Sequence, residues 1–162
     1  MFRIGQSFRY RECEQCGSVN LAEEVSSDTK LYPDNYYSFS VDPAQTFNGF
    51  LPRFLATAMA KSSLKGNRLL LGFMFRYAPM REVRTLASIL LSISAAYSGS
   101  VSKRILDVGT GSGVLPFVLS LAKRSYTLGI DPFLATEKKT KHFELKQASI
   151  QDIRETFNLM DF

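Results

Sequence analysis

The sequence predicts an α/β protein in which a C-terminal parallel sheet follows a helical and turn-rich N-terminal extension. Three observations lead to this prediction. Short apolar runs alternate with helical patterns after residue 100, apolar residues recur at helical spacing between residues 47 and 97, and turn-forming residues interrupt residues 1–42. With 162 residues, 45% of them hydrophobic, the chain can bury a core of ordinary size.

Residues 1–42 are predicted to be a Cys-bearing, turn-rich leader with little regular structure, because "LYPDNYYSF" places turn-forming residues among aromatic ones. Cys13 and Cys16 form a CxxC pair and are the only cysteines, so no disulfide framework is expected. Since His142 is the only histidine, we expect no complete metal site within one chain; a zinc site shared with another chain stays open. The sequence around the pair lacks the strand and helix of a redox CxxC.

Residues 43–99 are predicted to be helical, with Gly66 and Pro79 dividing them into two or three helices. Residues 43–104 hold 9 Lys or Arg but 1 Asp or Glu. This basic segment could contact phosphates or an anionic membrane surface, or could be the solvated faces of helices. Phe75, Arg76 and Tyr77 are interpreted mainly as core residues, so no specific nucleic-acid partner is expected.

Residues 100–162 alternate between strand and helix patterns, which predicts parallel strand pairing. In chain order the predicted elements are strand 104–109, helix 113–124, strand 126–131, a polar helix or loop 135–143, strand 142–149, short helix 150–157 and the start of a fourth strand at 157–162.

The first predicted strand runs directly into the glycine-rich turn "DVGTGSG", residues 107–113. In an open parallel sheet, ligands bind beyond the carboxyl ends of the strands. A dinucleotide fingerprint, GxGxxG, would need glycine at Val114, whereas the spacing here is GxGxG. Asp107 would repel a pyrophosphate but attract an ammonium group, which favours an amino-acid and nucleoside ligand. A dinucleotide site, or a helix-capping role for Asp107, remains the alternative.

Four segments together resemble class I S-adenosylmethionine-dependent methyltransferases. "DVGTGSG" matches that family's first motif, (D/E)xGxGxG. "LGIDPF" places Asp131 at the end of the second strand, and "QASIQDI" places Asp152 and Ile153 after the third. "FNLMDF" is similar to the fourth-strand motif, with Asn158 where the family often has Asp.

The resemblance implies S-adenosyl-L-methionine as the cofactor and a Rossmann-like sheet ordered 3-2-1-4-5-7-6, here truncated after the fourth strand. It implies that Asp131 grips the ribose hydroxyls and that Asp152 contacts the adenine amino group beside Ile153. For Asp152 a surface acid is the alternative. The implied cofactor-binding residues are Asp107, Gly109, Thr110, Gly111, Gly113, Asp131, Pro132, Asp152 and Ile153.

The implied function is methyl transfer to a small-molecule or glycan-type acceptor. Such a reaction requires mainly alignment of the reactants, and a general base only when the acceptor must lose a proton. No catalytic residue is identified; Tyr32, Tyr36 and Tyr37 could cover the site but fit turn packing better, and His142 is the weakest candidate. The alternative is a non-catalytic cofactor-binding fragment, or a subunit completed by a partner.

Two further expectations concern location and assembly. The apolar runs are too short to span a bilayer and the N-terminus lacks a signal-peptide pattern, so we expect a cytoplasmic protein. If the sheet stops at residues 157–162, its last strand is an unpaired edge, which predicts self-association through that strand. A fragment of this kind would bind cofactor weakly and transfer no methyl group.

Overall fold

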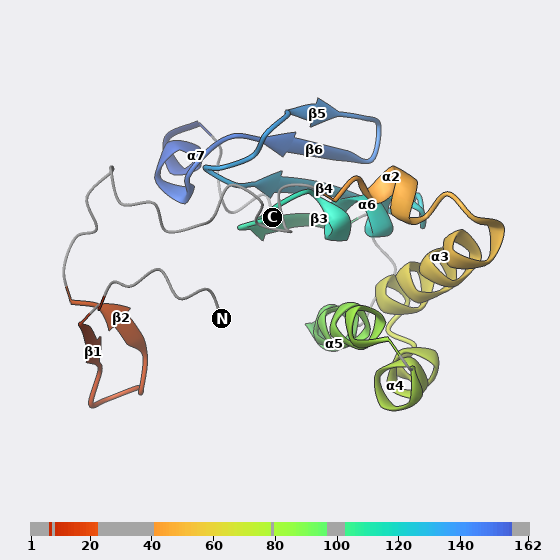
Figure 1. Ribbon diagram of the computed structural model, residues 1–162, viewed down its shortest axis with the longest axis horizontal. Helices are drawn as coiled ribbons and strands as arrows, with labels where there is room; N and C mark the ends of the chain where they lie inside the picture. Colours follow the sequence, from red (N-terminus) through yellow and green to blue (C-terminus); the bar gives the residue numbers. More distant parts are fainter. Residues whose placement is uncertain (1–6, 8, 23–40, 79, 97–102, 157–162) are drawn as a thin grey trace. The chain divides into compact units, whose positions relative to one another are not determined.

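The computed structural model describes residues 7, 9–22, 41–78, 80–96 and 103–156 (Figure 1). The chain separates into two compact units, Met1–Tyr36 and Tyr37–Phe162. Among the described residues, no helix combines the length and the apolar character needed to cross a membrane.

The described residues of the first unit contain one short hairpin, which the sequence did not predict. β1 (Tyr10–Glu12) and β2 (Val19–Leu21) form an antiparallel hairpin. The Cys13 N–H donates to the Ser18 carbonyl and the Gly17 N–H to the Cys13 carbonyl, both at 2.8 Å, and Gly17 has a φ of +69°. Strands of three residues are too short for their alternation to be recognised in a sequence.

In the second unit the helical character predicted for residues 43–99 is confirmed, but the described part of this segment contains four helices and not two or three. It contains α2 (Pro43–Thr46), α3 (Phe50–Leu64), α4 (Arg68–Tyr77) and α5 (Arg81–Ala96). The Asn67 side chain caps α4 by accepting from the Leu69 N–H, directly after Gly66 with its φ of +74°. The break between α4 and α5 falls where Pro79 was expected to interrupt the helix, although Pro79 itself lies outside the described residues.

The sheet contains β3 (Lys103–Val108), β4 (Ser125–Ile130), β6 (Phe143–Lys146) and β5 (Lys138–Lys139), in that spatial order. β3, β4 and β6 are parallel, as predicted, and in Figure 1 their arrowheads point the same way. β5 runs antiparallel to β6, so the sheet is mixed and not purely parallel.

Of the helix or loop predicted at residues 135–143, the loop alternative holds for 135–137 and 140–142, and the edge strand β5 interrupts it. Thr140 closes the tight turn between β5 and β6: its N–H donates to the Phe143 carbonyl at 2.8 Å, and its hydroxyl oxygen accepts from the Phe143 N–H at 3.0 Å. The predicted fourth strand, residues 157–162, lies outside the described residues.

Two helices follow the parallel strands, at the positions predicted. α6 (Val114–Ser120) follows β3, and α7 (Ile150–Thr156) follows β6. α6 is shorter than the predicted 113–124, because after Ser120 the N–H groups of Leu121, Ala122 and Lys123 bond to carbonyls three residues earlier in tighter turns. The φ of +55° at Lys123 then excludes any return to the helix.

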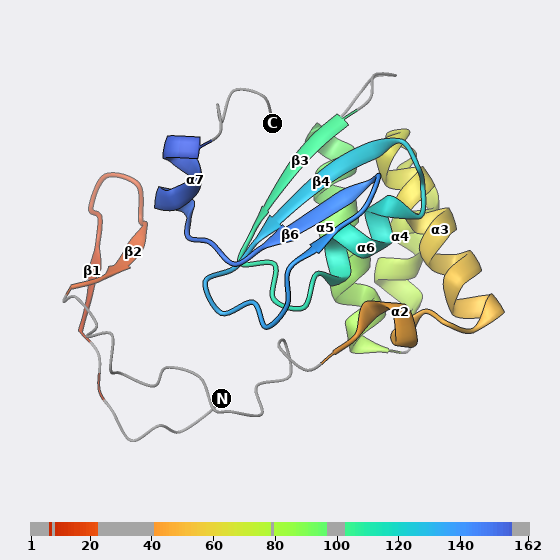
Figure 2. The same ribbon diagram turned by 90° about the horizontal axis from the view of Figure 1, so that it is seen from above.

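The helical segment and the sheet share one hydrophobic core. Buried residues of α3, α4, α5 and α6 form a continuous cluster with Ile105 of β3. On the other face of the sheet Ile153 of α7 packs with Leu128 and Ile130 of β4. The carboxyl ends of β3, β4 and β6 converge near the loops that lead to α6 and α7 (Figure 2).

Candidate functional site

The glycine-rich turn lies at the carboxyl end of β3 and is attached to the end of β4. The N–H groups of Gly109 and Thr110 donate to the Ile130 carbonyl at 2.8 and 3.0 Å. The Gly111 N–H donates to Asp131 Oδ2 at 2.9 Å. The structure therefore brings together the predicted turn and the predicted carboxylate Asp131, which are separated in sequence by α6.

The three glycines of the turn have positive φ values, but they meet different surroundings. φ is +75° at Gly109, +55° at Gly111 and +79° at Gly113. A Cβ on Gly113 would lie 2.5 Å from Leu145 Cδ1, whereas a Cβ on Gly109 would meet nothing within 4 Å. Gly113 thus permits close packing of the turn on β6, whereas the backbone at Gly109 is exposed to solvent at the outer edge of the turn.

Gly129, in the interior of β4, belongs to the same arrangement and was missed by the sequence analysis. A Cβ there would lie 2.7 Å from Thr110 Oγ1 and 2.8 Å from Leu145 Cδ2. The signal that could have identified it is a glycine inside a strand, which often marks a close backbone approach.

Asp107 is a half-buried carboxylate at the end of β3. The Thr110 hydroxyl donates to Asp107 Oδ2 at 2.7 Å. Burial raises the pKa of Asp107; the Thr110 hydrogen bond opposes this and the nearby Asp131 charge adds to it, so the pKa lies above its usual value. Within the described part of the chain, no lysine or arginine forms an ion pair with it. Such a carboxylate is suited to receive a cationic ligand group.

Asp131 is buried and binds the backbone with both of its oxygens. Oδ2 accepts from Gly111 and Oδ1 accepts from the Phe133 N–H at 2.8 Å. A ribose contact, as the resemblance implies, would use the remaining lone pairs of these oxygens. Pro132 is exposed beside it, and the apolar side chains of Phe133 and Val108 are also exposed at this rim.

Asp152 and Ile153 lie in the first turn of α7, after β6. Asp152 Oδ2 accepts from both the N–H and the hydroxyl of Ser149 at 2.7 Å, and the Asp152 N–H donates to Ser149 Oγ at 3.3 Å. This reciprocal capping of the helix lowers the pKa of Asp152. Ile153 is buried in the core cluster with β4. Both residues therefore have a structural role in α7.

The remaining catalytic candidates are not brought to the turn. His142 directly precedes the amino end of β6. The glycine-rich turn lies near the carboxyl end of the same strand. Tyr32 and Tyr36 belong to the first unit, and they lie outside the described residues, as do Tyr37 and Asn158. Cys13 and Cys16 are free and exposed in the hairpin of the first unit. Among the described residues, no group of three or more His, Cys, Asp or Glu side chains is arranged to hold a metal ion.

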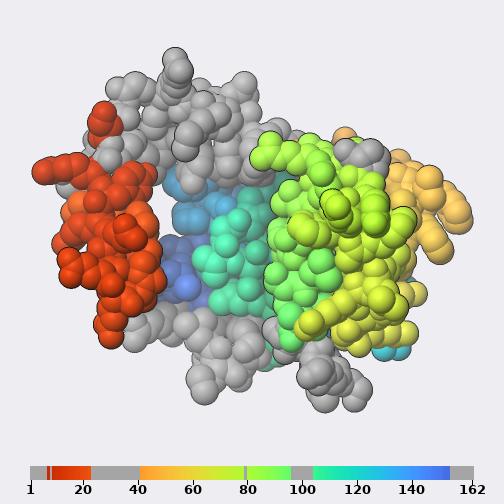
Figure 3. All heavy atoms as spheres, turned by 90° about the horizontal axis from the view of Figure 1, so that it is seen from below, coloured from red at the N-terminus to blue at the C-terminus, as the bar shows by residue number. Residues whose placement is uncertain are grey.

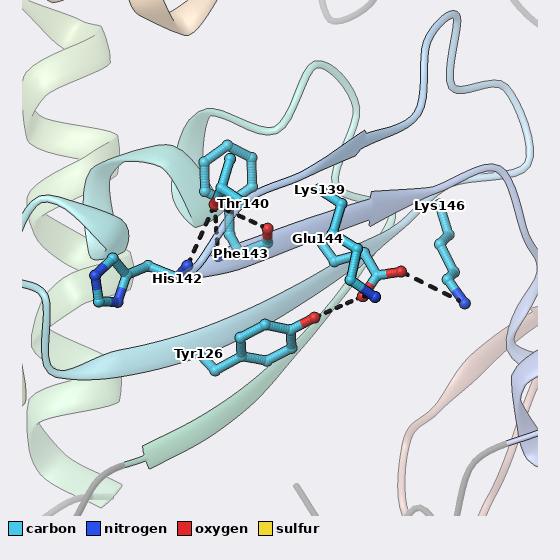
Figure 4. Close-up of polar contacts among 7 residues, drawn as sticks. All are labelled: Tyr126, Lys139, Thr140, His142, Phe143, Glu144 and Lys146. Atoms are coloured by element: carbon cyan, nitrogen blue, oxygen red, sulfur yellow. Dashed lines mark hydrogen bonds and ion pairs between the residues drawn. The ribbon is translucent and has the colours of Figure 1, made fainter.

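A polar network on the sheet was not anticipated from the sequence (Figure 4). The Tyr126 hydroxyl donates to Glu144 Oε2 at 2.6 Å, and the ammonium groups of Lys139 and Lys146 lie 3.0 and 3.6 Å from the Glu144 carboxylate. Burial and the bond to Glu144 raise the pKa of Tyr126 to about 12. Burial alone would raise the pKa of Glu144, but the hydrogen bonds from Tyr126 and Lys139 and the lysine charges lower it.

A groove of about 450 Å³ lies between α4 and α5, the helices drawn in yellow-green and green in Figure 3. The interpretation of Phe75 and Tyr77 as core residues is wrong, because their side chains are 47% and 67% exposed. The residues that line the groove include three arginines and no carboxylate: Phe75, Arg76, Arg81, Arg84, Thr85, Ser88 and Ile89.

Exposed apolar side chains adjoin this groove. Leu69, Phe73 and Tyr77 follow one another at four-residue intervals along α4, and all three are exposed. The Arg76 guanidinium lies 5.9 Å from the centroid of the Tyr77 ring. The cationic groove is therefore continuous with an apolar helix face.

Comparison of the chain with protein families, with characterised proteins and with solved structures finds no significant match in any of the three. The functional assignment therefore depends on the geometry of the site.

Proposed function

We propose that the chain binds S-adenosyl-L-methionine at the glycine turn and belongs to an S-adenosylmethionine-dependent methyltransferase. The observation that carries the proposal is a half-buried carboxylate, Asp107, beside a turn with three positive-φ glycines at the carboxyl end of a parallel strand. The spatial order of β3, β4 and β6 supports it, since the Rossmann-like sheet of such enzymes has its first three strands adjacent in this way.

In this proposal Asp107 receives the ammonium group of the methionine part. A positively charged ligand group would stabilise the ionised form of this half-buried carboxylate, because no cation from the described part of the chain already does so. Asp131 accepts from the ribose hydroxyls, and the exposed Val108 and Phe133 contact the adenine ring. The bound cofactor would supply an activated methyl group on a sulfonium. The protein's contribution is alignment of the acceptor and exclusion of water.

The acceptor is proposed to be a small molecule or glycan. No general base is assigned, because the chain's single histidine is remote from the turn along β6. This same observation favours the second candidate function, a cofactor-binding chain that needs a partner for methyl transfer. Self-association through residues 157–162 stays a prediction.

The decisive experiment is calorimetric titration with S-adenosylmethionine, S-adenosylhomocysteine and NAD. We expect both adenosyl compounds to bind, and Asp107→Asn to weaken their binding by about 10- to 150-fold, the range for a lost hydrogen bond to a charged group. Glu82→Gln is the matched control, because it removes an exposed carboxylate on α5. Binding of NAD alone, or equal effects of the two variants, would overturn the cofactor assignment.

Labelled cofactor separates the two candidate functions. Multiple turnovers across an acceptor panel would establish an enzyme. Tight cofactor binding without turnover would instead support the partner-dependent chain.

We also propose that the α4–α5 groove contacts an anionic membrane surface. The three arginines supply charge for lipid phosphates, and the exposed Phe73 and Tyr77 supply apolar contact. Vesicles of phosphatidylcholine with phosphatidylglycerol should retain the chain at low salt, and retention should fall steeply as salt is added.

The test compares two triple variants that remove equal charge. Substitution of Arg76, Arg81 and Arg84 by Gln should weaken vesicle binding by about 100-fold, at about a factor of five for each charge. The same change at the exposed Arg53 and Lys61 of α3 and at Lys65, which directly follows α3, should have much less effect. Equal losses of vesicle binding in the two variants would mean that the chain is retained by its net charge and not by the groove. Tighter binding to a single-stranded oligonucleotide than to vesicles would indicate a nucleic-acid partner instead.

A further inference from the structure

The hairpin of the first unit presents its two cysteines in one tight turn. Cys13 directly follows β1, and the turn closes with the hydrogen bonds of Cys13 to Ser18 and of Gly17 to Cys13. Gly17 has a positive φ, which permits the chain to reverse immediately after Cys16. Both thiols are exposed and free of a disulfide.

The side chain of Cys16 is held within the same turn. The Cys16 thiol donates to Ser18 Oγ at 3.2 Å. Cys13 and Cys16 therefore lie in one short turn with thiols exposed to solvent, and both would bind a metal as thiolates.

Within the described residues of the first unit, the hairpin has no buried core. All six strand residues are exposed, including Tyr10, Val19 and Leu21, and none of the described residues of this unit is buried. An isolated two-stranded hairpin is marginal in water, and small units without a core usually depend on a disulfide or a metal. A bound metal ion would therefore stabilise the hairpin, and the two thiols in its turn are suitable metal ligands.

We propose that Cys13 and Cys16 form half of a tetrahedral zinc site, which a second copy of the chain completes with its own two thiolates. Zinc in structural sites takes four ligands, and the C-x2-C spacing is typical of thiolate pairs that bind it. The 162 residues contain 2 cysteines and 1 histidine, and the two thiolates from each of two copies would make up the four ligands. Each thiol releases its proton on binding, so acid releases the metal.

The experiment uses the full chain, exchanged into zinc and then freed of excess metal. We expect one zinc ion per two chains by elemental analysis, and a dimer by light scattering that becomes a monomer in EDTA. Cobalt(II) in place of zinc should give the sulfur-to-cobalt charge-transfer band and visible bands of a tetrahedral thiolate site.

Variants distinguish a shared thiolate site from zinc bound elsewhere on the chain. Cys13→Ser and Cys16→Ser should each abolish zinc retention and the zinc-dependent dimer, whereas His142→Ala should leave both unchanged. The fold of Tyr37–Phe162, followed by the unfolding transition of its core, should persist in the cysteine variants because it is a separate unit.

Several results would overturn the proposal. One zinc ion per monomer, zinc loss in His142→Ala, iron in place of zinc, or a dimer that survives both EDTA and cysteine substitution would each do so. A mass two hydrogens lower, with no metal bound, would show that a Cys13–Cys16 disulfide is the stabilising group instead.

Discussion

Two carboxylates on the same sheet, Asp107 at the end of β3 and Glu144 on β6, have opposite electrostatic environments. The Glu144 carboxylate has a phenol and two ammonium groups as partners, and its pKa is lowered. Asp107 has one neutral hydroxyl and a neighbouring acid, and burial raises its pKa. Burial is common to both, so the difference comes from the charges brought beside each group.

This difference separates a structural role from a functional one. Glu144 joins β4, β5 and β6, and its charge is already compensated by the protein. Asp107 has a charge that the described part of the chain does not compensate, and a perturbed carboxylate of this kind at a strand end indicates a binding site.

The largest effect is expected where the turn beside Asp107 packs on β6. Gly113→Ala should lower the free energy of unfolding by about 2 to 4 kcal/mol, because its Cβ would overlap Leu145 and its φ is left-handed. Gly109→Ala, with a similar φ but open space, should cost about 1 to 2 kcal/mol. Urea denaturation measures both. Equal losses would mean that the turn does not depend on packing against Leu145.

Glu144→Gln should lower stability by about 1 to 3 kcal/mol at pH 7, because it removes hydrogen bonds to a charged group and both ion pairs. Since the folded pKa of Glu144 is below its unfolded value of 4.5, this stability is present above about pH 4.5. It is lost as the pH falls through the folded pKa, so wild type and variant should converge in acid.

Tyr126→Phe is the matched control for the network, because it removes the hydrogen bond and leaves the ion pairs. It should cost about 1 kcal/mol. A loss from Glu144→Gln that is independent of pH would contradict an electrostatic role for this carboxylate.

The smallest effect is expected at Asp107, with the opposite sign. Its folded pKa is raised, so the folded state binds the proton more tightly than the unfolded chain, and stability falls as the pH rises through the folded pKa. Asp107→Asn removes the ionised group and should raise stability at pH 7 by about 0.5 kcal/mol, with no gain at pH 3. Thermal unfolding at both pH values provides the measurement.

Asp131→Asn is the contrasting control at the neighbouring strand end. Its oxygens accept from Gly111 and Phe133, so an amide NH₂ would face a backbone donor and cost about 1 to 3 kcal/mol. If Asp107→Asn destabilised the chain as much as Asp131→Asn, Asp107 would be a structural cap.

The sequence predicted the elements that depend on local spacing. Apolar residues at helical intervals identified the segment that forms α3, α4 and α5, and Gly66 correctly indicated a break. The turn from Asp107 to Gly113 was located because glycines with positive φ are a local requirement. The capping box of Ser149 and Asp152 was present in the sequence as a local pattern but was not recognised.

Other features depended on contacts that no local pattern contains. β5 is two residues long and forms only because Thr140 closes a turn that pairs it with β6. The exposure of Phe75 and Tyr77 could not be predicted, because an apolar helix face does not specify which neighbour covers it.

The sequence by itself determined where the chain forms its parallel strands, its longer helices and the glycine turn, because backbone geometry follows from residues a few positions apart. Only the tertiary structure decided that Tyr126 and Glu144, 18 residues apart, face each other across β4 and β6. It also decided that Asp107 is half-buried near Asp131 without an ion-pair partner among the described lysines and arginines. Strand register and burial set these partners, and both arise only when distant segments pack together.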